Sequence, residues 1–111
     1  MGNDMNERQE PDFALDNVIH ERARLAVLTY LASSPLPSVS FTELRERLEL
    51  TAGNLSVQLR TLEQAGYVEV TKRIVGRKPA TTVSLTARGQ AAVQDYVDKM
   101  DVILRKLKSR G

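Results

Sequence analysis

The stretch TAGNLSVQLRTLEQAGYV, residues 51–68, contains the start, the buried face and the end of one helix. Thr51 suits the N-cap position, because its hydroxyl can accept a hydrogen bond from a free amide of the first turn. Gly66 is the residue type most common just after a helix. The sequence therefore predicts a helix over about residues 52–65. Its core-facing residues recur at spacings of four and three, the period of one helix face: Leu55, Leu59 and Leu62.

The residues before this helix predict two further helices. Apolar side chains recur at three-and-four spacing over about residues 13–33, which favours one long helix, with a break near Asn17 left open. A serine- and proline-rich run ends it, because proline removes a backbone donor and both residue types favour turns. Ser40, with a glutamate three residues later, has the spacing of a capping box. A short second helix is therefore predicted over about residues 41–49, after a very short strand at Val39.

The residues after the central helix predict a β-hairpin and a last helix. Two runs rich in β-branched residues flank a Gly-Arg-Lys-Pro connection, which is typical of a hairpin, here over about residues 67–85. Thr86 is the predicted cap of a final helix over about residues 86–108. The hairpin has four cationic side chains at or near its tip: Lys72, Arg73, Arg77 and Lys78.

The composition narrows the class of function. The chain has 111 residues, 41% of them apolar and 27% charged, which suits one globular domain; we place it at residues 13–108, after a polar, acidic leader at residues 1–12. With no cysteine and one histidine, there is little material for a metal site or for nucleophilic or general-base catalysis. We therefore expect no enzyme, no catalytic residue, no metal and no cofactor. We also expect no membrane span and no secretory signal, hence a cytoplasmic protein.

Basic side chains are concentrated in one part of the chain. The formal net charge is only +2, but residues 51–88 hold six basic residues and two acidic ones. Residues 1–13, by contrast, hold four acidic residues and one basic one. The central helix and the hairpin are therefore predicted to form a surface for an anion.

The order of elements predicts a fold. Two helices, a turn, a third helix, a basic hairpin and a last helix give the outline of a winged helix, a helix-turn-helix extended by a β-hairpin wing. The predicted fold class is α+β and mostly helical, with long helices at both ends. In such an arrangement the third helix and the hairpin are the elements available to bind DNA.

The sequence resembles bacterial winged-helix transcriptional regulators of the MarR and ArsR kind, in the small group that consists of little more than the DNA-binding domain. Three stretches carry the resemblance: IHERARLAVL at residues 19–28, NLSVQLRTLEQAGYV at residues 54–68 and GRKPATTVSLTARG at residues 76–89. The resemblance implies a third helix in the major groove and a hairpin tip on the flanking minor groove or backbone. It also implies that the terminal helices join two protomers and that the protein acts as a repressor.

The residues themselves allow the same interpretation. With the three leucines buried, a helical wheel turns short polar side chains outward, and these fit a DNA groove. The amides of Asn54 and Gln58 can pair with adenine, Val57 can touch a thymine methyl group, and Arg60 can contact guanine or phosphate. Capping and solvation remain the alternative roles. The predicted DNA-binding residues are Thr51, Asn54, Ser56, Val57, Gln58, Arg60, Thr61, Arg73, Arg77 and Lys78.

The last helix has an apolar seam with the heptad spacing of a coiled coil. A small domain has little internal surface for two long helices, so we expect a homodimer, although the seam could instead pack on the first helix of its own chain. A two-fold dimer would contact two half-sites about one DNA turn apart, which predicts a pseudo-palindromic operator. The predicted interface residues are Val93, Val97, Met100, Leu104 and Leu107.

Two further questions stay open at this point. A winged helix can also bind protein through its hairpin or third helix, so the alternative function is an interaction module that does not touch DNA. A small apolar effector between the first and last helices is a further alternative. Low sensitivity of binding to salt would favour the protein-interaction module, because phosphate contacts make DNA binding salt-dependent.

Overall fold

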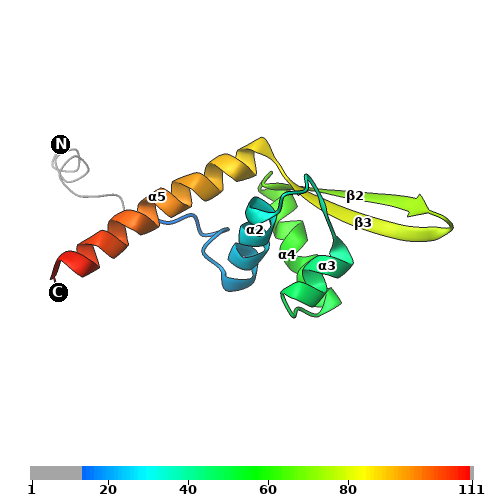
Figure 1. Cartoon of the computed structure of the whole chain (residues 1–111), viewed down its shortest axis with the longest axis horizontal. Helices are drawn as coiled ribbons and strands as arrows, with labels where there is room; N and C mark the ends of the chain where they lie inside the picture. The colour runs from blue at the N-terminus through cyan, green and yellow to red at the C-terminus, as the bar shows by residue number, and fades with distance from the viewer. Residues whose placement is uncertain (1–13, 111) are drawn as a thin grey trace.

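The structure, a computed structural model, describes residues 14–110, so the predicted leader at residues 1–12 lies outside the described residues. It has the α+β, mostly helical architecture expected of a winged helix, with the wing and the last helix extending in opposite directions (Figure 1). In chain order the elements are α2 (Arg22–Ser33), β1 (Val39–Ser40), α3 (Phe41–Arg47), α4 (Ala52–Gln64), β2 (Val68–Val75), β3 (Lys78–Leu85) and α5 (Ala87–Arg110).

A three-stranded antiparallel sheet of order β1-β3-β2 forms one side of the domain. β2 and β3 pair along their whole length, from Val68 opposite Leu85 to Val75 opposite Lys78. The two-residue connection between them has positive φ at both positions, 54° at Gly76 and 72° at Arg77. This is the backbone of a type I′ turn, whose twist matches that of the flanking strands. The paired strands extend beyond the helices as the wing (Figure 1).

The core lies where α2, α3 and α4 pack on the sheet. Its members include the three leucines of α4 that the sequence predicted to be buried, and Val27 and Leu28 of α2 lie beside them. Leu44 is the buried residue of α3, and Val68 and Val83 come from the sheet. One contiguous apolar cluster therefore fixes the position of α4, and its polar face is left on the surface.

The predicted helix caps are confirmed. The side chain of Ser40 accepts a hydrogen bond from Glu43 N at 3.0 Å, that of Thr51 from Asn54 N at 3.0 Å, and that of Thr86 from Gly89 N at 2.9 Å. After α4, Gly66 has φ of 83° and Tyr67 N donates to Leu62 O at 3.0 Å, a Schellman-type end. These local bonds determine where each helix begins or ends.

The prediction of one helix over residues 13–33 was wrong at its start, and the alternative of a break near Asn17 agrees with the structure. Residues 17–20 form turns, and α2 begins only at Arg22, with Glu21 as its N-cap. The reason is a competing local interaction: Asp16 Oδ1 accepts from Val18 N at 2.8 Å and from Ile19 N at 3.4 Å. Ile19 is fully buried in the core although it does not lie in a helix. Its place in the apolar pattern therefore reflects burial and not helical structure. The other predicted bounds differ by one or two residues: α3 ends at Arg47, α4 at Gln64 and α5 at Arg110.

A compact joint connects α5 to the body of the domain. The carbonyl of Tyr67 accepts from Thr86 N at 3.0 Å, and Gly89 packs against this same carbonyl. The hydroxyl of Tyr67 donates to Asp16, and this hydrogen bond raises the pKa of the Tyr67 phenol above its ordinary value. The His20 Nδ1 atom and the Tyr96 hydroxyl are 2.8 Å apart, so the single histidine, which is exposed, forms a further contact with α5.

Beyond the joint, α5 extends away from the domain body (Figure 1). Its 24 residues correspond to about 36 Å of helix. The radius of gyration is 17.3 Å, against about 13 Å for a compact domain of 100 residues. No helix among residues 14–110 has the length and apolar character needed to cross a membrane.

Candidate nucleic-acid interface

The outer face of α4 is divided into two polar stripes by an exposed apolar residue. Val57 is 53% exposed and lies between a stripe that faces α2 and a stripe that faces the wing. The predicted outward orientation of this face follows from the buried leucines on the opposite side of the helix. Because the side chains along it are mostly short, this face can enter a DNA groove or a similarly narrow groove of another partner.

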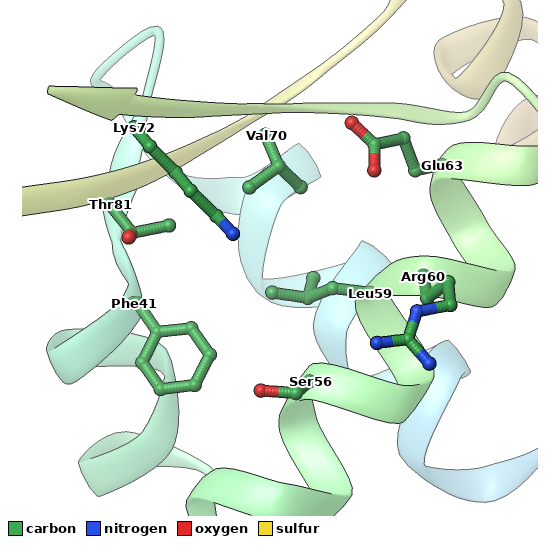
Figure 2. A pocket seen from close by; sticks show the side chains of 8 residues that line it. All are labelled: Phe41, Ser56, Leu59, Arg60, Glu63, Val70, Lys72 and Thr81. Carbon is green, nitrogen blue, oxygen red and sulfur yellow. The ribbon is translucent and has the colours of Figure 1, made fainter.

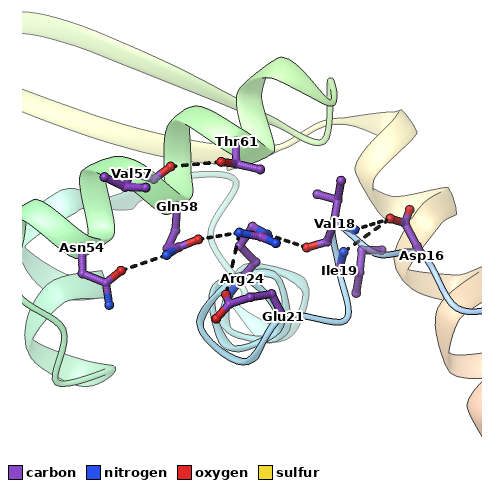
Figure 3. Close-up of polar contacts among 9 residues, drawn as sticks. All are labelled: Asp16, Val18, Ile19, Glu21, Arg24, Asn54, Val57, Gln58 and Thr61. Carbon is purple, nitrogen blue, oxygen red and sulfur yellow. Dashed lines mark hydrogen bonds and ion pairs between the residues drawn. The ribbon is translucent and has the colours of Figure 1, made fainter.

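The stripe facing α2 is held by hydrogen bonds. Asn54 and Gln58 are joined to each other, Nε2 of Gln58 donating to Oδ1 of Asn54 at 2.8 Å, and Gln58 is joined to Arg24 of α2 (Figure 3). The Thr61 hydroxyl donates to the carbonyl of Val57 at 3.3 Å, so it bonds within its own helix. Thr51 caps α4 and is exposed at its start. The structure thus places these predicted residues together at one edge of α4.

The stripe facing the wing lines a pocket of about 320 Å³ between α4, the start of α3 and the sheet (Figure 2). The Lys72 ammonium extends from β2 towards the pocket, and the Arg60 guanidinium and Ser56 hydroxyl come from α4 (Figure 2). Glu63 lies at the far end, and an apolar floor is formed by Phe41, Leu59 and Val70. The lining has two cationic side chains and a hydroxyl group against one carboxylate, so its charge is net positive and it can hold an anionic group such as a phosphate.

The three predicted wing residues are exposed but do not lie together. Arg77 is in the turn and Lys78 begins β3, so both are at the tip of the wing. Arg73 pairs with Ala80 in the middle of the wing, and strand alternation places it on the face opposite to Lys72. Arg73 is therefore separated from the pocket, whereas Ser56 and Arg60 line it.

Two residues of this surface were missed in the predicted set. Lys72 shares a strand face with Val68 and Val70, and a strict period of two would have placed it towards the core side of the wing, beside α4. Arg24 had no such signal, because its partner Gln58 is 34 positions away in the sequence. Among the described residues no group of three or more His, Cys, Asp or Glu side chains is placed to hold a metal ion.

The apolar seam of α5 is divided between the body of the domain and the surface. Val93 and Met100 are partly buried against the core. Val97, Leu104 and Leu107 are 51%, 47% and 64% exposed, so the described part of the chain leaves them uncovered. A shallow groove on this side is lined by Tyr96, Val97, Met100, Asp101 and Leu104.

Comparison with known proteins agrees with this geometry. Residues 23–104 match the family described as "Winged helix DNA-binding domain". An uncharacterized protein of Methanocaldococcus jannaschii is 31% identical over 80 residues, which cover 72% of this chain and 85% of that protein.

Solved structures show the same fold. A transcriptional regulator homologue from Pyrococcus horikoshii superimposes with a TM-score of 0.76 at 24% identity, over 96% of this chain and 98% of that one. A PadR family transcriptional regulator from Eggerthella lenta gives 0.64 at 20% identity, over 79% and 81% of the two chains. The matches include archaeal proteins, a wider group than the bacterial regulators that the sequence resembles.

The family match extends from the second residue of α2 into the last turns of α5, and so includes both stripes of α4 and the wing. It describes a DNA-binding domain and not an enzyme, as the composition indicated. The structural neighbours named here are small transcriptional regulators or their homologues. The chain therefore belongs to the winged helix DNA-binding domain family.

Proposed function

We propose that this protein is a sequence-specific regulator of transcription that binds double-stranded DNA in the cytoplasm and represses by occupying an operator. In this proposal α4 enters the major groove and the wing lies on the flanking backbone or minor groove. The observation that carries it is the pocket that Lys72 of the wing shares with Arg60 and Ser56 of α4, because a phosphate placed there would link the two elements.

The conformation of Arg77 supports a functional wing tip. Its φ of 72° is a backbone conformation that favours glycine or asparagine, and an arginine there costs about 1 kcal/mol. A strained backbone at the exposed end of the wing motivates the hypothesis that the side chain has a binding role. Its guanidinium is exposed at the end of the wing, where it can bind a phosphate or enter a narrow minor groove.

The test of the function is a fluorescence-anisotropy titration. A labelled duplex from the region upstream of the protein's own gene is compared with an unrelated duplex at several salt concentrations. We expect a steep decrease of affinity with salt and a preference for one selected sequence, whether upstream or recovered from a randomised pool. Absence of binding even at low salt would contradict the proposal and favour the protein-interaction module.

The first prediction concerns the wing tip. Asparagine tolerates a positive φ, so Arg77→Asn is expected to leave the free energy of unfolding unchanged or slightly higher. The same change should weaken DNA binding about fivefold for all sequences and reduce the slope of log K against log salt by about 0.9, because one phosphate contact is lost. Lys78→Ala should act in the same direction.

The matched control for Arg77→Asn is Arg105→Asn, which removes the same charge from the exposed surface of α5. Chemical denaturation and anisotropy titrations are carried out on both variants. A slope identical in wild type and Arg77→Asn would remove the wing tip from the DNA interface.

We further propose that the protein binds DNA as a homodimer joined along α5, on a pseudo-palindromic operator. Three exposed apolar side chains on one side of a helix that extends beyond its domain support this, since such a surface is stabilised by burial. Two-fold symmetry would place two copies of α4 at half-sites about one DNA turn apart.

A further inference from the structure

A series of three hydrogen-bonded side chains, Arg24, Gln58 and Asn54, runs from α2 to the surface of α4 (Figure 3). Arg24 donates from Nη1 to Oε1 of Gln58 at 2.8 Å and from Nε to the carbonyl of Val18 at 2.6 Å. Gln58 then donates from Nε2 to Oδ1 of Asn54 at 2.8 Å. The Arg24 side chain is only 18% exposed, whereas Asn54 lies on the surface. A largely buried cation is thus linked through one amide to a second, exposed amide.

The chemistry of the first member determines the direction of every bond in the series. A guanidinium group has donors and no acceptor, so the atom of Gln58 that faces Arg24 must be its oxygen. The Gln58 nitrogen then faces Asn54, whose own oxygen must accept the hydrogen bond. The NH₂ group of Asn54 is consequently the end that points away from Gln58 (Figure 3). One arginine therefore determines the orientation of two amides.

Arg24 is itself held in place by several contacts. Besides Val18, the carboxylate of Glu21 lies 3.9 Å from its guanidinium and accepts from its backbone amide at 3.0 Å. Val18 is fixed in turn, because its amide donates to Asp16 Oδ1 at 2.8 Å. The irregular segment before α2 therefore holds the Arg24 side chain in place. Because this side chain is already ordered, less conformational entropy is lost when DNA binds.

This orientation bears on base recognition. Adenine presents an amino donor and the N7 acceptor in the major groove, so a bidentate amide pair needs a free oxygen as well as a free NH₂. Here the Gln58 oxygen faces α2 and the Asn54 oxygen faces Gln58. The adenine pairing expected from the sequence would therefore have to use the one remaining lone pair of the Asn54 oxygen, whereas the NH₂ group already points away from Gln58. Guanine presents two acceptors, O6 and N7, which an outward NH₂ group can contact.

We propose that Arg24 is a positioning residue that determines the base preference of α4. By turning the NH₂ group of Asn54 outward, it favours guanine over adenine at the base that Asn54 faces. This inference rests on the proposed DNA-binding function and goes beyond it by naming the residue and the base. Arg24 acts through Gln58 and Asn54 and makes no base contact of its own.

The decisive variant is Gln58→Glu, which has nearly the same shape but can only accept. Its carboxylate would accept from Arg24 and from the NH₂ group of Asn54, so the Asn54 oxygen would turn outward. Selection from randomised duplexes should then show a change at one operator position, from guanine to a base with an amino donor in the major groove, adenine or cytosine, by about tenfold. The control is Gln64→Glu, the same charge change in α4 outside the series, which should keep the guanine preference.

A second pair of variants tests the arginine directly. Arg24→Met removes both donors and should equalise the affinities for guanine and adenine at that position. Arg24→Lys keeps a charged donor and should restore most of the preference. In the free protein, the side-chain NH₂ signals of Asn54 and Gln58 in ¹⁵N spectra should shift in Arg24→Met, and the backbone signals of the core should not. If Arg24 had a purely structural role, its substitution would not change the preference for one base at one operator position.

The outcomes separate this inference from the proposed function. Failure of the wild type to select any sequence would overturn the function and the base preference together. If the wild type selects a sequence and both Gln58→Glu and Arg24→Met keep its preference unchanged, only the role of Arg24 is overturned. NH₂ signals of Asn54 that are unchanged in Arg24→Met would overturn it without any DNA experiment.

Discussion

Gly89→Ala is expected to be the most destabilising small substitution in the protein, with a loss of about 3 kcal/mol in the free energy of unfolding. A Cβ atom at this position would lie 2.1 Å from the carbonyl oxygen of Tyr67 and 2.9 Å from both its carbonyl carbon and Leu85 Cδ1. The carbonyl cannot move away freely, because it accepts the hydrogen bond from Thr86 N at the start of α5. Relief of the clash therefore requires α5 to separate from the sheet.

Gly53→Ala is the matched control for this substitution. Gly53 also lies in the first turn of its helix, α4, and a Cβ atom there would have no neighbour within 4 Å. Alanine should therefore raise stability, by less than about 1 kcal/mol. Urea denaturation of both variants gives the comparison. Equal stability of Gly89→Ala and wild type would mean that α5 does not pack on Tyr67 as described.

The second large effect is expected in the seam of α5. Val97→Glu combined with Leu104→Glu should give a folded monomer, because both side chains are about half exposed in the single chain. Its affinity for a two-half-site operator should fall about a hundredfold or more, since the second half-site is no longer bound by a linked protomer. Light scattering gives the mass, circular dichroism the fold, and anisotropy the affinity.

Ala91→Glu combined with Val102→Glu is the control for the seam. These positions add the same two charges to the same helix, but helical periodicity places them on the side away from the seam. The control should keep the mass and DNA affinity of the wild type. A seam variant that also keeps the wild-type dimer mass, or a wild type that is monomeric at all concentrations, would contradict the α5 dimer.

The elements that the sequence predicted well are those specified by neighbouring residues. The leucine period of α4 and the hydroxyl caps at Ser40 and Thr51 act within a few positions, so the pattern contains the information needed. The start of α2 failed for the opposite reason. Asp16 binds two nearby amides and holds the chain in a turn, although the apolar spacing around it suits a helix.

The candidate site shows the same division between local and long-range information. Helical periodicity was enough to predict which side of α4 faces outward, whereas the bond between Arg24 and Gln58 joins residues of two different helices. Nothing in the spacing of either residue indicates the other. The amide orientations of Asn54 and Gln58, and with them the expected base, therefore depended on tertiary structure. Lys72 is intermediate, since strand alternation would have placed it beside α4.

The joint between Tyr67 and Gly89 also has a geometric consequence. α5 acts as a lever arm of about 36 Å, given its 24 residues and the rise of a helix. A rotation of about 10° at the joint would displace the far end by about 6 Å, nearly two base-pair steps of 3.4 Å each. In a dimer joined along α5, the tight contact at Gly89 would fix the angle of α5 and therefore the distance between the two copies of α4. That distance determines the spacer length between the half-sites.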